Sequence, residues 1–277
     1  MATKVYGVLG YPVKHSLSPL MHNAAFKALG LDAEYVLFEK TPQDLAGFLL
    51  SLGKEGISGI NVTVPYKEKV ISYLSSLSKE AQLIGAVNTI KVSDTQLEGF
   101  NTDGDGFIRH LTEDLKFDLR GKNVAMLGAG GASRAVAVYL AIAKIKSLAV
   151  YDVDQAKALA LVEHLKNNFQ DIEFRVVNSV NSLNIRSCAL LINATPVGMK
   201  ETDPLLVEPD MLHKDLLVYD LIYNPAKTKL LQSAEEARAK VSNGLGMLLH
   251  QGARSFELWT GQQAPLAAMR IALQQKG

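Results

Sequence analysis

The stretch Gly121-Lys-Asn-Val-Ala-Met-Leu-Gly-Ala-Gly-Gly-Ala-Ser133 decides the fold of the middle of the chain. Residues 123–127 form an apolar run of strand length, three glycines interrupt it, and apolar residues then recur with helical spacing from residue 132 to 143. A strand, a glycine turn and a helix in this order are typical of a dinucleotide pyrophosphate site, because the turn and the helix N-terminus present backbone N–H groups to phosphate. Ser133 stands where the third glycine of that pattern belongs, so a plain tight turn is the alternative.

Composition narrows the class of protein. The 277 residues suit two domains, and 48% hydrophobic with 21% charged residues indicates a globular chain. A net charge of +1 without a basic run argues against nucleic acid. No signal-peptide pattern and no membrane-length apolar stretch is present, so we expect a cytoplasmic protein that does not bind a membrane. The single cysteine, Cys188, heads an apolar run and is predicted to be a buried core residue.

Strand and helix patterns alternate on both sides of the glycine turn. Strands are predicted near 147–151, 172–177, 188–193 and 216–222, which together with 123–127 gives a doubly wound, Rossmann-type α/β domain. The preceding segment has strands at 5–10, 35–38 and 57–64 with helices between them, which predicts a second α/β domain with a parallel sheet. A long helix through His250, Gln251 and Trp259 and a last helix from Pro265 to Gln275 close the chain.

Two serines precede the first predicted helix. Pro19 suits the first helical position, which makes Ser18 the N-cap. If the approach is extended, the hydroxyls of Ser16 and Ser18 point to the same side and can hold a carboxylate beside the helix N-terminus. A cap and an unrelated serine explain the same residues.

Polar side chains also follow several strands of this first segment. Asn61 and Thr63 share a face of one strand, and Lys67 follows just past its carboxyl end, where ligands bind in open α/β sheets. Asn88-Thr89 and Asn101-Thr102-Asp103 end two further apolar runs. Turn chemistry explains each case alone, but their convergence indicates a site for a small polar ligand.

The motifs occur in the order found in a known family. They are Ser16 to His22, Asn61 to Lys67, Gly85 to Thr89, Phe100 to Gly104, Gly128 to Arg134, Asn193 to Met199 and Gly244 to Met247. Over its whole length the chain resembles the shikimate dehydrogenases. The resemblance implies two α/β domains flanking a cleft, with residues 1–102 and 240–277 binding substrate and residues 103–239 binding a nicotinamide cofactor. It also implies reversible hydride transfer between 3-dehydroshikimate and shikimate.

The resemblance assigns roles to individual residues. Lys67 and Asp103 would be the catalytic pair, which fits a reaction that needs a proton on the oxygen and no metal. Substrate would be bound by Ser16, Ser18, Asn61, Thr63, Asn88, Asp103, Tyr223 and Gln251. The cofactor would contact Gly128, Ala129, Gly130, Gly131, Ala132, Asp152, Thr195, Leu221, Gly244 and Met247.

Asp152 departs from the pattern of the NADP-using members, which usually carry Asn-Arg-Thr at this place. A carboxylate accepts hydrogen bonds from ribose hydroxyls but repels a 2′-phosphate. The sequence therefore predicts NAD(H), with NADP(H) as the alternative if Lys157 reaches the phosphate.

Three other functions fit parts of the pattern. One is an NAD-dependent quinate/shikimate dehydrogenase of broader specificity, although Ser18 favours shikimate. Another is a non-catalytic dinucleotide or metabolite sensor, which would need neither Lys67 nor Asp103. The third is a methylene-tetrahydrofolate dehydrogenase, which the two serines disfavour. The partner is expected to be a small-molecule substrate, and the oligomeric state is open between monomer and homodimer.

Overall fold

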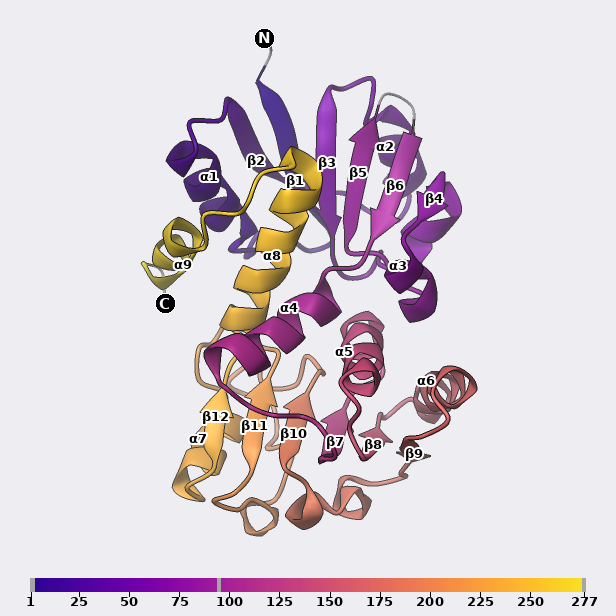
Figure 1. Cartoon of the computed structure of the whole chain (residues 1–277), viewed down its shortest axis with the longest axis vertical. Helices are drawn as coiled ribbons and strands as arrows, with labels where there is room; N and C mark the ends of the chain where they lie inside the picture. The colour runs from indigo at the N-terminus through magenta and orange to yellow at the C-terminus, as the bar shows by residue number, and fades with distance from the viewer. Residues whose placement is uncertain (1–2, 94–95, 276–277) are drawn as a thin grey trace. The chain divides into compact units, whose positions relative to one another are not determined.

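The computed structural model describes residues 3–93 and 96–275, and the chain divides into two compact α/β units (Figure 1). The first unit comprises Met1–Phe107 and Leu248–Gly277, and the second comprises Ile108–Met247. The predicted fold class, an α/β unit followed by a Rossmann-type unit, is confirmed.

The sheet of the first unit has the strand order β2-β1-β3-β5-β6-β4. Its strands are β1 (Lys4–Gly10), β2 (Ala33–Glu39), β3 (Ile57–Val62), β4 (Ser76–Leu77), β5 (Thr89–Ser93) and β6 (Gln96–Phe100). The predicted parallel arrangement holds for β1, β2 and β3, whereas β5 runs antiparallel to both β3 and β6. An antiparallel pair needs only a short connection, and the chain between β5 and β6 is too short for a parallel crossover.

Helices flank this sheet and enclose its core. They are α1 (Ser18–Ala28), α2 (Leu45–Ser51), α3 (Lys79–Ile84), α4 (Asp103–Arg109), α8 (Leu245–Thr260) and α9 (Leu266–Gln274), of which α4 and α8 each continue into the second unit. Helices α1 and α9 lie side by side (Figure 1). One core cluster joins α2 to the sheet through Leu49, Leu52, Ile60 and Ile90, each at most 1% exposed.

The sheet of the second unit has the order β12-β11-β10-β7-β8-β9, and its strand pairs are parallel. The strands are β7 (Asn123–Leu127), β8 (Ser147–Tyr151), β9 (Glu173–Val176), β10 (Leu190–Asn193), β11 (Leu217–Asp220) and β12 (Lys240–Ser242). Consecutive strands leave β7 first toward β8 and β9 and later toward β10 and β11. This reversal of strand order beside β7 is where open α/β sheets bind dinucleotides.

The helices of the second unit follow its strands. They are α5 (Gly131–Ile142), α6 (Gln155–Asn168) and α7 (Lys229–Glu236), and a π-helical turn, η2 (His110–Asp114), continues α4. Helices α5 and α6 pack beside one another, as Figure 1 shows. Cys188 is 6% exposed within the core, which confirms its predicted burial, and burial raises the pKa of its thiol.

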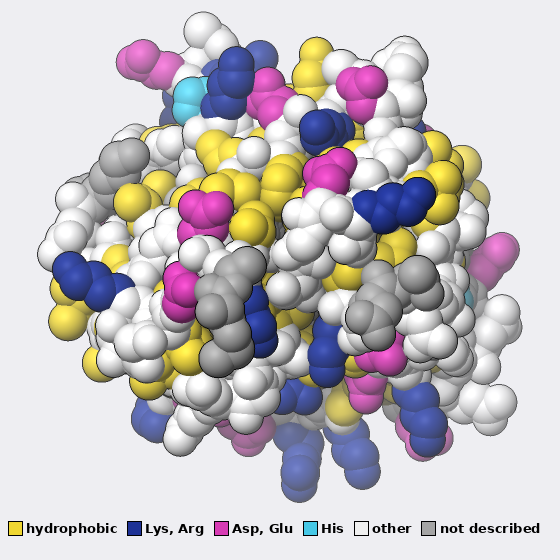
Figure 2. Space-filling view, turned by 90° about the horizontal axis from the view of Figure 1, so that it is seen from above, with side chains coloured by type: hydrophobic (Ala, Val, Ile, Leu, Met, Phe, Trp, Pro, Cys, Tyr) yellow, Lys and Arg dark blue, Asp and Glu magenta, His cyan; other side chains and the backbone are white. Residues whose placement is uncertain are grey.

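Across residues 3–93 and 96–275, every helix is too short or too polar to span a bilayer. The face drawn in Figure 2 carries basic and acidic side chains interspersed with apolar and uncharged ones, so neither sign of charge dominates it.

Candidate active site

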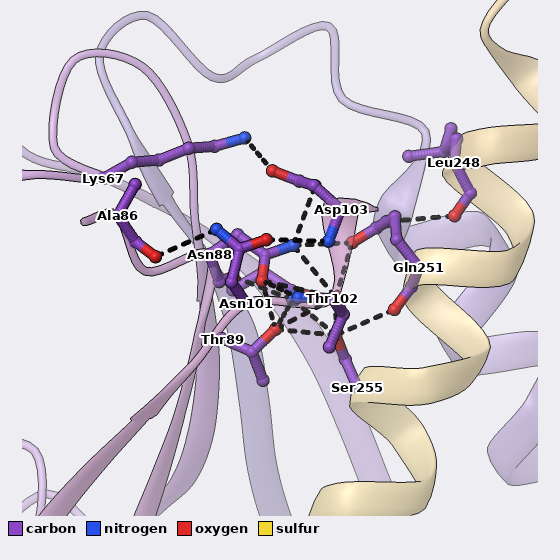
Figure 3. Close-up of polar contacts among 11 residues, drawn as sticks. Lys67, Ala86, Asn88, Thr89, Asn101, Thr102, Asp103, Leu248, Gln251 and Ser255 are labelled. Carbon is purple, nitrogen blue, oxygen red and sulfur yellow. Dashed lines mark hydrogen bonds and ion pairs between the residues drawn. The ribbon is translucent and has the colours of Figure 1, made fainter. Parts of the chain in front are cut away.

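Lys67 and Asp103 come together in the first unit. Lys67 follows β3 by five residues, and Asp103 is the first residue of α4. The Lys67 Nζ donates to Asp103 Oδ2 at 2.5 Å, and the two side chains are 15% and 8% exposed (Figure 3). The structure therefore places an ammonium group against a carboxylate in a largely desolvated position, where charges interact more strongly than in water.

Asn88 holds the other side of the Asp103 carboxylate. Its Nδ2 donates to Asp103 Oδ1 at 2.8 Å, and its Oδ1 accepts the backbone N–H of Thr102 at 2.7 Å. The backbone N–H of Asp103 donates to the Oδ1 of Asn101. The Nδ2 of Asn101 in turn donates to the carbonyl of Ala86. The two Asn-Thr motifs identified in the sequence thus meet across the β5–β6 pair (Figure 3) and fix the orientation of Asp103.

Asn61 lies next to Asn88, and both the nitrogen and the oxygen of its side-chain amide form hydrogen bonds within the protein. Its Nδ2 has three acceptors, the carbonyl of Asn88 at 3.1 Å, Thr89 Oγ1 at 3.0 Å and Ser255 Oγ at 2.9 Å. Its Oδ1 accepts from the Tyr35 hydroxyl at 2.7 Å. Asn61 is 5% exposed, so the geometry gives it an internal role that orders its neighbours.

Helix α8 contributes Gln251 and Ser255 to the same group. Gln251 Oε1 lies 3.3 Å from Asn88 Nδ2, while its Nε2 donates to the carbonyl of Leu248 at 2.9 Å. A side chain at Gly106 would meet Gln251, since a Cβ there would lie 2.5 Å from the backbone nitrogen of Gln251. The absence of a side chain at Gly106 therefore lets α4 approach α8 closely.

Ser16 and Ser18 differ in part from the prediction. Ser16 Oγ accepts the backbone N–H of Ser18 at 3.3 Å, which brings the two serines together. The predicted N-cap is wrong, because Leu17 takes the N-cap position and Ser18 already lies inside α1. The extended approach is also wrong, since Leu17 has helical dihedrals and the N–H of Ser16 donates to the carbonyl of Val13 in a turn. A turn shortens the connection and lets the hydroxyl of Ser16 reach the first turn of the helix.

Thr63 stands at the end of β3, half-buried. Its methyl group occupies the space beside Gly10 of the neighbouring β1, where a Cβ would lie 2.5 Å from Thr63 Cγ2. Its backbone N–H donates to the carbonyl of Leu9 at 2.8 Å, which continues the pairing of the two strands.

Several residues near Asn61 were not predicted from the sequence. His22 stacks on Tyr35 with ring centroids 4.3 Å apart and planes 7° apart, and Trp259 lies against both rings. His22 is fully buried, and this burial lowers its pKa to about 3. Among the described residues, neither ring nitrogen of His22 has a hydrogen-bond partner. The spacing of His22 four residues after Ser18 was a signal for its position, because such residues share one helix face.

In the second unit, the glycine turn has the geometry of a phosphate site. Gly128 has φ of 101°, and a Cβ there would lie 2.8 Å from the carbonyl oxygen of Ala194 at the end of β10. Gly130 is the N-cap of α5, and a Cβ on it would meet no atom within 4 Å. Gly130 is exposed, and Gly131 and Ala132 in the first turn of this 12-residue helix are half-buried, so the helix N-terminus is accessible and fits a dinucleotide pyrophosphate. Ser133, in place of the third glycine, is completely buried.

Asp152 follows β8 and points back to the glycine turn. Its Oδ2 accepts the backbone N–H of Ala129 at 2.7 Å, and its Oδ1 accepts that of Asp154 at 2.8 Å. Lys157 pairs with Asp154 at 3.2 Å. The carboxylate of Asp152 is thus held by two backbone donors and is not the isolated charge on which the predicted NAD preference depends.

A buried pair of polar residues orders the loops after β10 and β11. Asp220 accepts from Asn193 Nδ2 at 3.0 Å, from the N–H of Ile222 at 3.0 Å and from the Thr228 hydroxyl at 2.7 Å. Asn193 Oδ1 accepts both the N–H and the hydroxyl of Thr195. Burial raises the pKa of Asp220, and these three donors oppose that shift. The pair thereby fixes Thr195, a predicted cofactor residue.

The remaining predicted residues of this unit lie near the end of β11 and the start of α8. The N–H of Gly244 donates to the carbonyl of Ile222, and a Cβ on Gly244 would lie 2.0 Å from the carbonyl oxygen of Leu221. Met247 is 8% exposed. Tyr223, predicted to bind substrate, belongs to this second unit, and burial raises the pKa of its hydroxyl.

A dinucleotide-type unit and a buried lysine–carboxylate pair at strand ends define an oxidoreductase that acts on a CH–OH group with a nicotinamide cofactor. The shikimate dehydrogenase (NADP(+)) of Methanopyrus kandleri is 46% identical over 276 residues, covering 98% of this chain and 95% of that protein. The chain belongs to the shikimate dehydrogenase family, as its sequence motifs predicted.

Matches to family models and to solved structures support the same family assignment. Residues 8–90 match the shikimate dehydrogenase substrate binding domain, and residues 244–274 match the shikimate 5′-dehydrogenase C-terminal domain. A shikimate dehydrogenase crystallised with NADP+ superposes with a TM-score of 0.92 at 40% identity, covering 100% of this chain and 97% of that one. Shikimate 5-dehydrogenase from Listeria monocytogenes, in complex with shikimate and NAD, superposes with a TM-score of 0.89 at 37% identity, covering 98% and 96% of the two chains.

The predicted preference for NAD is wrong. The relatives that are 40–46% identical to the chain, the Methanopyrus kandleri protein among them, carry NADP(+) in their names. The prediction relied on repulsion between a free Asp152 carboxylate and a 2′-phosphate. Because Asp152 is anchored to the backbone of Ala129 and Asp154, its negative charge is partly balanced by two N–H dipoles.

Proposed function

We propose that the chain catalyses the reversible, NADP-dependent reduction of 3-dehydroshikimate to shikimate. The observation that carries this proposal is the buried contact between Lys67 Nζ and Asp103 Oδ2 in a member of the shikimate dehydrogenase family. The cofactor is inferred from the names of the relatives and from the open glycine turn before α5.

Lys67 acts on the oxygen of the substrate in this proposal. Bound NADPH supplies the hydride for the carbonyl carbon. The Lys67 ammonium donates a hydrogen bond to the carbonyl oxygen, stabilises the negative charge that develops there, and gives it a proton. Asp103 holds the ammonium in place and, after proton transfer, accepts a hydrogen bond from the neutral amine. In the reverse direction the amine takes the hydroxyl proton.

The other polar residues divide between binding and support. Ser16 and Ser18 bind the substrate carboxylate, since the hydroxyl of Ser16 accepts the backbone N–H of Ser18, the first residue of α1. Asn88, Gln251 and Thr63 contact the hydroxyl-bearing ring, together with Tyr223 from the second unit. Asn61 positions its neighbours and does not contact the substrate, because its side-chain amide already forms hydrogen bonds with Tyr35 and Ser255.

The glycine turn and the loops of the second unit hold the cofactor. The pyrophosphate binds at Gly128, Ala129, Gly130, Gly131 and Ala132, where the helix dipole of α5 favours negative charge. Thr195, Leu221, Gly244 and Met247 surround the nicotinamide end, and Asp152 lies on the adenosine side. We further propose that the first unit binds substrate and the second unit binds the cofactor, which shifts the predicted bounds of 1–102 with 240–277 and of 103–239, because β12 (Lys240–Ser242) pairs with β11 in the second unit. We also propose a cytoplasmic monomer or homodimer.

Initial rates of the purified protein test this function. Shikimate and quinate are each oxidised at saturating NADP+ and, separately, at saturating NAD+, and absorbance of the reduced cofactor is followed. We expect the highest kcat/KM for shikimate with NADP+. Oxidation of quinate at a comparable rate would instead identify an enzyme of broader specificity. Binding of NADP+ without turnover of either compound would favour the non-catalytic sensor.

A further inference from the structure

A line of hydrogen bonds in the second unit leads to the start of α8. His110 Nδ1 lies 2.6 Å from the hydroxyl of Tyr219, and His110 Nε2 lies 4.0 Å from Asp114 Oδ2. The two rings meet edge to face, with centroids 5.5 Å apart and planes at 76°. Tyr219 is fully buried in β11 and His110 is 8% exposed, so both partners are held inside the protein.

The hydroxyl of Tyr219 also accepts the backbone N–H of Met247. Met247 is the third residue of α8, and the N–H groups of a first helical turn have no acceptor within the helix. The N–H of Leu245 is satisfied by Asn243 Oδ1 at 3.1 Å. Tyr219 and Asn243 therefore cap the first turn of α8 from two sides.

The directions of these hydrogen bonds are mutually consistent. Tyr219 accepts from Met247, so its own proton points to His110 Nδ1, which leaves the ring proton on Nε2 facing Asp114. Burial raises the pKa of Tyr219, so the hydroxyl keeps the proton that it donates. His110, Tyr219 and Met247 thus form one chain of donors and acceptors, and Asp114 Oδ2 lies 4.0 Å from the Nε2 end of that chain.

The packing of His110 explains why the second glycine of the Gly-Leu-Gly-Met motif, Gly246, has no room for a side chain. A Cβ on Gly246 would lie 2.2 Å from ring atoms of His110, so the imidazole occupies the space of a side chain. A Cβ on Gly244 would collide with the carbonyl of Leu221. The first turn of α8 therefore packs closely against His110, and its Met247 N–H also donates to Tyr219 of β11.

We propose that His110 and Tyr219 are positioning residues for the nicotinamide cofactor, acting through the first turn of α8. This inference rests on the proposed function, in which Gly244 and Met247 contact the cofactor. By fixing the backbone of Met247 relative to β11, the two side chains set the shape of the surface that receives the nicotinamide. Neither side chain touches the cofactor in this proposal, and their effect is on the affinity for it.

The test compares four proteins, namely the wild type and the variants Tyr219→Phe, His110→Leu and His110→Asn. Tyr219→Phe keeps the ring and removes the hydroxyl, and His110→Leu removes the acceptor for that hydroxyl. His110→Asn restores an acceptor near the position of Nδ1. The dissociation constant for NADP+ is measured by titration calorimetry, together with KM for shikimate and the unfolding temperature of each protein without ligands.

We expect Tyr219→Phe and His110→Leu to weaken NADP+ binding about fivefold, the usual scale for one hydrogen bond, with KM for shikimate unchanged. His110→Asn should recover most of the affinity. Unchanged NADP+ binding in the first two variants, even with a lower unfolding temperature, would overturn the proposal. So would equal losses in His110→Leu and His110→Asn. If the wild type binds NADP+ but does not oxidise shikimate, the proposed function fails while the binding ratios still decide this inference.

Discussion

Asn88 donates through Nδ2 to Asp103 at 2.8 Å while its Oδ1 accepts from Thr102 at 2.7 Å, so the Asn88 amide is fixed at both ends. A fixed amide leaves Asp103 with one oxygen bonded to Asn88 and the other to Lys67. The carboxylate is thereby oriented before any ligand arrives, which lowers the reorganisation needed during catalysis.

Replacing Lys67 by methionine tests the catalytic pair. Lys67→Met keeps the length of the side chain and removes the proton donor, so kcat should fall by about 10² or more, the usual contribution of a general acid or base. Lys69→Met is the matched control, because Lys69 is an exposed lysine two residues later. Steady-state rates of shikimate oxidation provide the comparison. A near-normal kcat in Lys67→Met would remove Lys67 from the mechanism.

Ser16 should influence the binding of substrate more than its turnover. Ser16→Ala removes one charge-assisted hydrogen bond to the carboxylate, so KM for shikimate should rise about tenfold with a smaller change in kcat. KM for NADP+, measured on the same protein, serves as the internal control. If KM rose for NADP+ and stayed constant for shikimate, Ser16 would have been assigned to the wrong ligand.

Apolar periodicity predicts single strands and helices better than it predicts contacts between residues that are distant in the sequence. It located β7 and α5, and the Asn-Thr pairs at strand ends marked Asn88 and Asp103, which the structure joins by a hydrogen bond. Ser255 was not predicted, because it lies 194 residues from its partner Asn61 and its type alone carries no signal. The hydrogen bond from the Tyr35 hydroxyl to Asn61 was not predicted either, because the sequence shows Tyr35 only as a residue of an apolar strand.

Two further predictions are wrong because of local backbone geometry. The sequence pattern predicts Ser18 as the N-cap of α1, but Leu17 adopts helical dihedrals and the helix starts one residue earlier. Asp152 was treated as an isolated charge, yet the N–H groups of Ala129 and Asp154 both donate to it. In both cases the deciding contact is with a backbone group, which the type of a residue does not reveal.

Asp152 gives a test of the electrostatics at the cofactor site. Asp152→Asn keeps a side-chain oxygen for the N–H of Ala129 and removes the negative charge. Two unit charges about 4 Å apart repel by roughly 1 kcal/mol in water, and the N–H groups of Ala129 and Asp154 offset part of this, so kcat/KM for NADP+ should rise by up to about fivefold. The ratio to wild type is measured at fixed low ionic strength and again at high salt, where screening should reduce the gain. No gain at low salt would show that Asp152 does not face the 2′-phosphate.

His22 should make the stability of the protein depend on pH. Its pKa is about 3 in the folded state because the ring is completely buried, and near 6.5 when unfolded. Between these values the unfolded chain binds a proton that the folded chain does not, so stability falls as the pH falls below about 6.5. From pH 7 to pH 5 this single residue should remove about 2 kcal/mol from the free energy of unfolding.

Two variants separate the titration of His22 from its packing. His22→Leu removes the ionisable ring, so its stability relative to wild type should improve by about 2 kcal/mol between pH 7 and pH 5, whatever the cost of lost stacking on Tyr35. Phe26→Leu is the control, because Phe26 is buried in the same aromatic cluster and does not titrate. Urea unfolding followed by circular dichroism at both pH values measures the differences. If wild type and His22→Leu lost stability in parallel, the ring would be protonated in the folded state, and burial alone would not control its pKa.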